Sequence, residues 1–139
     1  MFVYETNIRV RYGETDQMGY AYYGVYPLYY EIGRTDMLRS LGLSYKEMEA
    51  SGILLPVSSL SIKYIKPAYY DDLLTLRTMI KKLPQSKLEF EYEIYNSDNE
   101  LINKGETTLV FFSAASRKPI QAPNNFLKEL KKAMKYAKT

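Results

Sequence analysis

Residues 10–41 read VRYGETDQMGYAYYGVYPLYYEIGRTDMLRSL, and the rest of the chain is organised around this change from strand to helix. Two carboxylates, Glu14 and Asp16, fall in a turn-forming stretch at the end of a strand pattern. Six of the fifteen tyrosines lie between Tyr20 and Tyr30. Pro27 suits the first turn of a helix, because its missing amide hydrogen would have no partner there. The stretch therefore predicts a tyrosine-rich turn that leads into the N-terminus of a helix.

The helix predicted over residues 27–41 has a helical spacing of side chains. The positions that recur at three or four residues are Leu28, Ile32, Thr35, Leu38 and Leu41. Gly42 stands where a C-terminal cap is expected. Gly33, inside the helix, is less favourable than alanine by about 1 kcal/mol, which indicates that another backbone passes close by. We expect a buried helix packed tightly on a sheet.

The flanking sequence alternates with a period of two, as strands with one buried face do. A first strand is predicted within residues 2–12, with Ile8, Val10 and Tyr12 on one face. Later strands are predicted over residues 59–64, 74–81, 88–94 and 101–114, and Gly105 is interpreted as a bulge in the last. Leu60, Ile62 and Tyr64 are expected on the buried face of the first of these later strands.

Two further helices are predicted. Ser44 and Glu47 have the spacing of a capping box, so a short helix should run to about Ala50 and end at Gly52. After Pro123, one face of a basic amphipathic helix is formed by apolar positions at Phe126 or Leu127, Leu130, Ala133, Met134 and Ala137. Hairpin-connected strands after one buried helix indicate a single α+β domain over residues 1–139, in which an antiparallel sheet of about five strands wraps around that helix.

The composition excludes several kinds of chemistry. The 139 residues contain no cysteine and no histidine. Disulfides, thiolate nucleophiles, imidazole acid–base catalysis and zinc sites built on these residues are therefore excluded. Acid–base work must come from Asp, Glu, Tyr or Lys. We predict no metal site.

Nothing in the sequence indicates a membrane span or a leader. No apolar run approaches the roughly 18 residues that a membrane span needs, and the N-terminal residues lack the apolar core of a signal peptide. We expect a soluble cytoplasmic protein.

The net charge of +3 is unevenly distributed. Residues 117–139 contain seven Lys or Arg and one acid, a local charge of +6, so the remainder carries about −3. A basic tail of this kind is either a solvated helix face or a phosphate-binding patch. Because the predicted terminal helix has no interleaved aromatic platform beyond Tyr136, a nucleic-acid role is weakly supported, and we predict none.

Asp16 is the strongest candidate for chemistry. An acidic residue in a turn often only bonds its own backbone, and this remains one interpretation. However, the turn leads to a helix N-terminus, where free amides and the helix dipole favour an anion. The tyrosines supply walls that exclude water. A carboxylate beside an anion hole indicates hydrolysis of a reactive acyl bond.

The segment RYGETDQMGYAYYGVYPLYYEIGRTDMLRSLG resembles the signature of the hot-dog-fold acyl-CoA thioesterases of the 4-hydroxybenzoyl-CoA thioesterase and YbgC-like group. The resemblance continues through IKYIKPAYYDDLLTLRT and GETTLVFF to the Arg-Lys-Pro after the last strand, so it covers nearly the whole chain. It implies a hot-dog fold, and a homodimer with sites at the subunit interface, which is often paired again into a homotetramer.

The resemblance also implies residue roles. Asp16 matches the catalytic carboxylate, which acts as nucleophile or as general base. Tyr23 matches the residue whose backbone amide points at the thioester oxygen, and Gly24 lies beside it. Many YbgC-like members have a histidine where Tyr23 stands and an asparagine where Val25 stands.

Further candidates are proposed for substrate binding. Tyr12 and Tyr26 are candidates for the pocket, and Tyr12 is equally consistent with a residue at the edge of the core. Glu31 corresponds to a helix glutamate that another hot-dog branch uses, and pairing on its own helix is the alternative. Candidates for the phosphates of coenzyme A are Lys63, Lys66, Lys82, Lys87, Arg117 and Lys118. Glu14 is interpreted as structural.

The predicted function is hydrolysis of an acyl thioester of coenzyme A or of acyl carrier protein. No cofactor is expected, since coenzyme A is part of the substrate. The alternative from another class is a non-catalytic module that binds acyl-CoA. A hot-dog dehydratase is disfavoured, because those enzymes resemble one another in needing a histidine.

Overall fold

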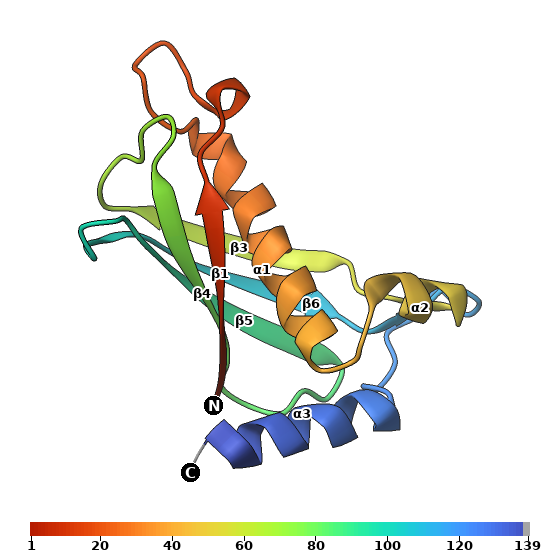
Figure 1. Cartoon of the computed structure of the whole chain (residues 1–139). Helices are drawn as coiled ribbons and strands as arrows, with labels where there is room; N and C mark the ends of the chain where they lie inside the picture. Colours follow the sequence, from red (N-terminus) through yellow and green to blue (C-terminus); the bar gives the residue numbers. More distant parts are fainter. Residues whose placement is uncertain (138–139) are drawn as a thin grey trace.

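The computed structural model describes residues 1–137 and is built on a five-stranded antiparallel sheet with a long helix across one face (Figure 1). The strand order is β1-β4-β5-β6-β3. The strands are β1 (Phe2–Arg9), β3 (Val57–Tyr64), β4 (Leu73–Ile80), β5 (Lys87–Tyr95) and β6 (Leu101–Val110). Every neighbouring pair is antiparallel. The predicted α+β architecture is confirmed.

The remaining elements connect and cover this sheet. The helices are α1 (Tyr26–Ser40), α2 (Tyr45–Ala50) and α3 (Asn124–Ala137), and the 3-10 turns are η1 (Tyr12–Glu14) and η2 (Tyr23–Val25). A separate two-stranded sheet pairs β2 (Ile53–Leu54) with β7 (Phe112–Ser113). Figure 1 shows α3 across the end of the sheet where β1 begins. The predicted helix bounds differ from the observed ones by one or two residues.

The buried face of α1 differs from the predicted one. Leu28 and Ile32 were expected in the core, yet they are 57% and 43% exposed. The buried residues are Tyr26, Tyr29, Tyr30, Gly33, Arg34, Met37 and Leu38. Both sets satisfy helical spacing, so periodicity alone does not choose between them. The tyrosines are buried because each ring packs while its hydroxyl can reach a polar partner.

Two glycines allow α1 to approach the sheet. A Cβ on Gly33 would overlap the side chains of Leu76 and Thr78 on β4. The predicted close approach is therefore present, although side chains rather than a backbone make it. A Cβ on Gly105 would overlap the ring of Tyr30.

Gly105 is not a bulge, contrary to the prediction. It pairs in register with Ile62 on one side and Tyr92 on the other. The ring of Tyr30 lies over it and stacks on Tyr92 with centroids 4.1 Å apart. Glycine is needed here because the ring of Tyr30 occupies the space that a side chain at position 105 would fill.

The sheet buries the predicted residues in two strands but not in the third. Residues 74, 76, 78 and 80 of β4 and residues 88, 90, 92 and 94 of β5 are buried. In β3, Leu60 is 45% and Tyr64 49% exposed, contrary to the expectation. The reason is that β3 is an edge strand and α1 does not cover it fully.

The chain ends differ in smaller ways from the prediction. The strand expected over residues 101–114 is interrupted at Phe111, which is buried and whose N–H donates to the carbonyl of Ser86 at 2.8 Å. In α3, Phe126 and Leu130 are buried as expected. Ala137 is expected on the same apolar face, and its side chain lies outside the part of the chain whose side chains are described. The Ser44 cap is confirmed, since its hydroxyl accepts from the N–H of Glu47 at 3.2 Å.

Candidate active site

The loop that carries Asp16 is fixed by its own backbone hydrogen bonds. The N–H of Asp16 donates to the carbonyl of Tyr20 at 3.1 Å, and the N–H of Gly19 donates to the carbonyl of Asp16 at 3.0 Å. Gly19 has φ +86°, a conformation that suits glycine. Oδ1 of Asp16 accepts from the N–H of Met18 at 2.9 Å. Oδ1 of Asp16 is therefore used in a hydrogen bond within the turn, which leaves Oδ2 for another partner.

Asp16 lines a cavity of about 300 Å³. The cavity lies between the Asp16 loop, the start of α1 and the chain just after β3. Its lining residues are Asp16, Met18, Tyr20, Ala21, Tyr23, Tyr26, Tyr64, Ile65, Lys66 and Pro67. Asp16 and Lys66 are the charged members of this lining, and aromatic or apolar side chains make up the rest.

The turn η2 presents backbone amides at the entrance to α1. The N–H of Tyr22 is used, because it donates to the carbonyl of Glu14 at 2.8 Å. Tyr23 and Gly24 are the first two residues of the turn. The N–H groups at the start of a helix have no carbonyl acceptor within that helix. The N–H of Val25 closes the turn on the carbonyl of Tyr22 at 3.0 Å. The amides of Tyr23 and Gly24 are thus available to an anion.

Tyrosines from η2, α1 and β3 hold this end of the cavity together. The hydroxyl of Tyr64 donates to the carbonyl of Tyr23 at 2.8 Å. The rings of Tyr26 and Tyr64 meet edge to face with centroids 5.4 Å apart. Burial raises the pKa of Tyr26 to about 12, so its hydroxyl is protonated at neutral pH. Tyr26 is therefore a wall of the cavity and not a base.

Glu14 links the Asp16 loop to the central helix. Its carboxylate accepts from the N–H of Arg11 at 2.9 Å and from the hydroxyl of Tyr29 at 2.9 Å. Nη2 of Arg11 lies 3.1 Å from Oε2 of Glu14. Burial alone would raise the pKa of Glu14, but the hydrogen bonds from Arg11 and Tyr29 outweigh it and hold this pKa below its ordinary value. The structural role predicted for Glu14 is present, and its partner Tyr29 was not predicted.

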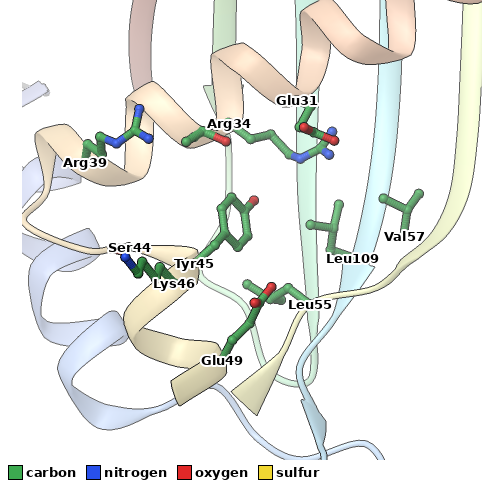
Figure 2. Close-up of a pocket in the computed structure, with 11 residues that line it drawn as sticks. Glu31, Arg34, Arg39, Ser44, Tyr45, Lys46, Glu49, Leu55, Val57 and Leu109 are labelled. Atoms are coloured by element: carbon green, nitrogen blue, oxygen red, sulfur yellow. The ribbon is translucent and has the colours of Figure 1, made fainter. Parts of the chain in front are cut away.

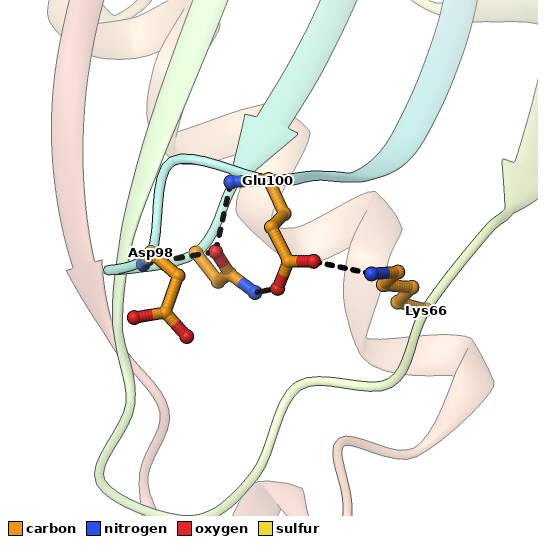
Figure 3. A network of polar contacts seen from close by, with 4 residues as sticks. Lys66, Asp98 and Glu100 are labelled. Carbon is orange, nitrogen blue, oxygen red and sulfur yellow. Dashed lines mark hydrogen bonds and ion pairs between the residues drawn. The ribbon is translucent and has the colours of Figure 1, made fainter.

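Lys66 reaches the cavity rim but already has a partner. Its ammonium forms an ion pair with Glu100 in the turn between β5 and β6 (Figure 3). The side chain of Asn96 supports this turn by accepting from the N–H of Glu100 at 2.9 Å and of Asp98 at 3.0 Å. The pKa of Glu100 is lowered by its hydrogen bond from Lys66. A phosphate bound by Lys66 would have to share this lysine with Glu100.

The structure brings some predicted site residues together and separates others. Asp16, Tyr23, Tyr26 and Lys66 line the same cavity, and Gly24 follows Tyr23 in η2. The others do not line it. Tyr12 is 78% exposed and lies beside Tyr70. Lys63 lies on the sheet face opposite α1, and Arg117 is exposed in the turn after β7. Glu31 lines a different cavity (Figure 2).

Sequence reasoning did not single out several residues of the cavity lining. Tyr64, Ile65 and Pro67 come from the segment IKYIKPAYY, which carried the family resemblance without an assigned role. Tyr20 belongs to the tyrosine-rich run. The density of tyrosines was the available signal for Tyr20.

Comparison with known proteins identifies the class. The sequence pattern of the Thioesterase-like superfamily matches residues 10–130. The chain belongs to this superfamily, and its fold is the hot-dog fold of thioesterases.

Two relatives are similar over most of their length. The chain is 39% identical over 121 residues to "Putative acyl-CoA thioesterase YneP" of Bacillus subtilis, covering 87% of this chain and 88% of that protein. It is 32% identical over 124 residues to the acyl-CoA thioester hydrolase YbgC of Escherichia coli, covering 89% and 92%.

A solved structure is also similar. It is the DHNA-CoA thioesterase of Staphylococcus aureus, with a TM-score of 0.88 and 33% identity over 99% of this chain and 92% of that one. No helix within residues 1–137 is long and apolar enough to cross a membrane.

Proposed function

We propose that this protein hydrolyses acyl-CoA thioesters in the cavity that contains Asp16. The observation that carries the proposal is the meeting of a carboxylate, an apolar cavity of about 300 Å³ and the amides of η2 at the entrance to α1. The names of the relatives YneP and YbgC and of the staphylococcal structure support the acyl-CoA substrate class. A thioester of acyl carrier protein is the alternative substrate.

In the proposed reaction, an oxygen attacks the thioester carbonyl and the carbon–sulfur bond breaks. The attacking oxygen comes from Asp16 itself, giving a mixed anhydride that water then cleaves, or from a water whose proton Asp16 takes. In either case negative charge develops on the carbonyl oxygen. The amides of Tyr23 and Gly24, with the dipole of α1, would stabilise that charge. Coenzyme A leaves as a thiolate.

The positions of Tyr23 and Val25 bear on how water is handled. Tyr23 lines the cavity, whereas Val25 is 5% exposed and does not. The family resemblance implies a histidine and an asparagine at these positions in many YbgC-like members, and both side chains offer polar groups to a water. In this chain, the binding of such a water would depend on Asp16 and on tyrosine hydroxyls.

The proposal uses no metal or cofactor beyond the coenzyme A of the substrate, so a chelator should not reduce turnover.

The direct test is the Asp16→Asn variant. We expect release of free thiol from a panel of short, long and aromatic acyl-CoAs to fall by on the order of a thousandfold, about 4 kcal/mol of barrier. Asp98→Asn is the matched control, because Asp98 is an exposed turn residue outside the cavity. Turnover by Asp16→Asn at the control rate would refute the assignment of Asp16.

A non-catalytic acyl-CoA-binding module is the second candidate. It is favoured by Val25, since the family resemblance implies an asparagine at this position in many members. This reading predicts tight binding of acyl-CoA with no thiol release by the wild-type protein. Calorimetric binding combined with the thiol assay on the same sample separates the two functions.

We propose that the functional unit is a homodimer formed through β3, with a homotetramer as a further possibility. β3 is an edge of the sheet, and its inner side exposes Leu60 and Tyr64. The neighbouring face of α1 exposes Leu28 and Ile32. An uncovered edge with an apolar margin favours pairing with a second copy. Because Tyr64 also lines the Asp16 cavity, this interface would adjoin the catalytic site.

A further inference from the structure

The side chain of Tyr64 joins the sheet to the backbone of the turn η2. Tyr64 is the last residue of β3, where it pairs with Asn103 of β6. Its hydroxyl donates to the carbonyl of Tyr23 at 2.8 Å. Its ring meets the ring of Tyr26 edge to face, with centroids 5.4 Å apart. The sheet therefore holds the backbone of Tyr64, and the start of α1 supports the ring that carries the hydroxyl.

The carbonyl of Tyr23 lacks one donor that a helix normally provides. In an α-helix, each carbonyl accepts from the N–H of the residue four positions later. For Tyr23 that residue is Pro27, and proline has no N–H. The helix cannot supply this hydrogen bond, so the hydroxyl of Tyr64 supplies a donor from β3.

This carbonyl belongs to the same peptide group as the N–H of Gly24. The peptide group is trans and therefore planar, so its C=O and its N–H point in opposite directions. In a helical turn the N–H groups point toward the N-terminal end, where an anion is favoured. A hydroxyl that holds the carbonyl of Tyr23 thus also fixes the direction of the Gly24 N–H, which is one of the two amides of the proposed anion hole.

The hydrogen bond from Tyr64 also affects how strongly the Gly24 N–H donates. Hydrogen bonds in a chain polarise one another, so a peptide group whose carbonyl accepts a bond donates more strongly through its N–H. This effect requires a protonated hydroxyl. Burial raises the pKa of Tyr64 above its ordinary value, and the nearby Tyr23 raises it further, so the hydroxyl keeps its proton at neutral pH.

We propose that Tyr64 is a positioning residue for the anion hole of η2, because its hydroxyl holds the peptide group between Tyr23 and Gly24 so that the Gly24 N–H is directed at the developing oxyanion. The inference rests on the proposed hydrolysis at Asp16 and adds one residue to that reaction. Since Tyr64 acts through this peptide group, loss of its hydroxyl should slow the chemical step and leave KM nearly unchanged.

The first experiment follows the peptide group itself and needs no turnover. Gly13 and Gly24 are the two glycines of the chain that follow a tyrosine. Labelling with ¹³C-carbonyl tyrosine and ¹⁵N glycine therefore selects these two amide signals by NMR, and Gly13→Ala tells them apart. In Tyr64→Phe we expect the ¹⁵N signal of Gly24 to move upfield, because its peptide carbonyl loses a hydrogen bond, while the signal of Gly13 stays in place. An unchanged Gly24 signal would overturn the proposal.

The second experiment measures the reaction. We expect kcat for acyl-CoA hydrolysis to fall about tenfold in Tyr64→Phe with KM within about twofold of wild type, a smaller loss than removal of an oxyanion donor itself causes. Tyr95→Phe is the matched control, because it also removes a hydrogen-bonded hydroxyl and Tyr95 does not line the Asp16 cavity. A wild-type kcat in Tyr64→Phe, with or without a raised KM, would overturn the proposal. Absence of thiol release by the wild-type protein would instead refute the proposed hydrolysis, and the role of Tyr64 would fall with it.

A rescue variant separates positioning from packing. Pro27→Ala restores an N–H four residues after Tyr23, where it can replace the donor lost from Tyr64. The double variant Tyr64→Phe/Pro27→Ala should therefore recover most of the lost kcat and return the Gly24 signal toward its wild-type position. Pro27→Ala alone is the control for the substitution, and sedimentation velocity checks that all variants have the same oligomeric state. A double variant as slow as Tyr64→Phe would assign Tyr64 to packing and overturn the proposal.

Discussion

The carboxylate of Glu14 receives hydrogen bonds from both sides of the loop that carries Asp16. Arg11 donates from the start of the loop, and Tyr29 donates from one turn inside α1. The carbonyl of Glu14 also accepts from the N–H of Tyr22, the residue before η2. One residue therefore joins the segment with the proposed carboxylate to the turn with the proposed anion hole. The distance between Asp16 and the amides of η2 depends on this link through Glu14.

Tyr29→Phe tests this link through Glu14, because the substitution removes one hydroxyl. Tyr29 is 1% exposed and phenylalanine keeps its ring, so packing should persist while Glu14 loses a donor. We expect kcat per folded protein to fall about tenfold with KM nearly unchanged, because small displacements of a catalytic group slow the reaction. Steady-state kinetics with an acyl-CoA substrate measure this. Tyr70→Phe, an exposed tyrosine, is the control. A loss of folded protein with unchanged kcat would show a purely structural role.

Glu14 also makes stability depend on pH in a defined direction. Its pKa is lowered in the folded protein, so its contribution is present above the ordinary glutamate pKa and is lost as the pH falls through the folded-state value. The gap in unfolding free energy between wild type and Glu14→Gln should therefore shrink between pH 7 and pH 3. Urea unfolding at a series of pH values measures this gap. A constant gap would contradict the stated origin of the pKa shift.

The contact between α1 and the sheet depends on small residues at two crossing points. Gly33 admits Leu76 and Thr78, and Gly105 admits the ring of Tyr30, which stacks on Tyr92. Because protein interiors are closely packed, a single added methyl group at either position must displace its neighbours. The position of α1, and with it the position of η2, follows from these contacts.

Gly105→Ala should lower the free energy of unfolding by about 1–3 kcal/mol, because the new methyl group would overlap the ring of Tyr30. Gly13→Ala is the matched control, since a Cβ there meets nothing within 4 Å and its φ is not in the left-handed region. Thermal or urea unfolding of both variants gives the comparison. Equal stability of the two variants would show that Tyr30 can move aside freely.

On the scale of the whole molecule, the two sheet edges differ. The edge strand β1 is followed by the Asp16 loop and contacts α3, whereas β3 exposes Leu60 and Tyr64 beside the exposed Leu28 and Ile32 of α1. The outer face of the sheet instead carries ion pairs such as Lys81 with Glu91 at 3.1 Å. The apolar margin of β3 is thus the surface that favours a second copy.

Leu60→Lys should convert the proposed homodimer to monomer, because it places a charge at the middle of β3. Leu83→Lys is the control, as Leu83 is 40% exposed in the connection between β4 and β5. Sedimentation velocity at micromolar concentration reports the state of each variant. A wild-type monomer, or a dimer that survives Leu60→Lys, would argue against pairing through β3.

Local signals in the sequence were enough for the order of the three helices and the five strands of the main sheet, though not for the short strands β2 and β7, and for the main candidate residue. The capping box at Ser44, the alternation in β4 and β5, and Pro27 at the start of α1 act between near neighbours in the chain, so a sequence displays them directly. Asp16 emerged in the same way, from a turn that leads into a helix.

Only the tertiary structure decided which face of α1 is buried, that Tyr29 holds Glu14, and that Arg34 lines a cavity and forms no ion pair within residues 1–137. The bond from Tyr29 to Glu14 joins residues 15 apart, and that from Arg34 to Tyr92 joins residues 58 apart. Periodicity describes one element at a time, and two faces of α1 have similar spacing. Which face is buried depends on side-chain shape across the contact, where glycines 33 and 105 make room, and that information exists only once helix and sheet meet.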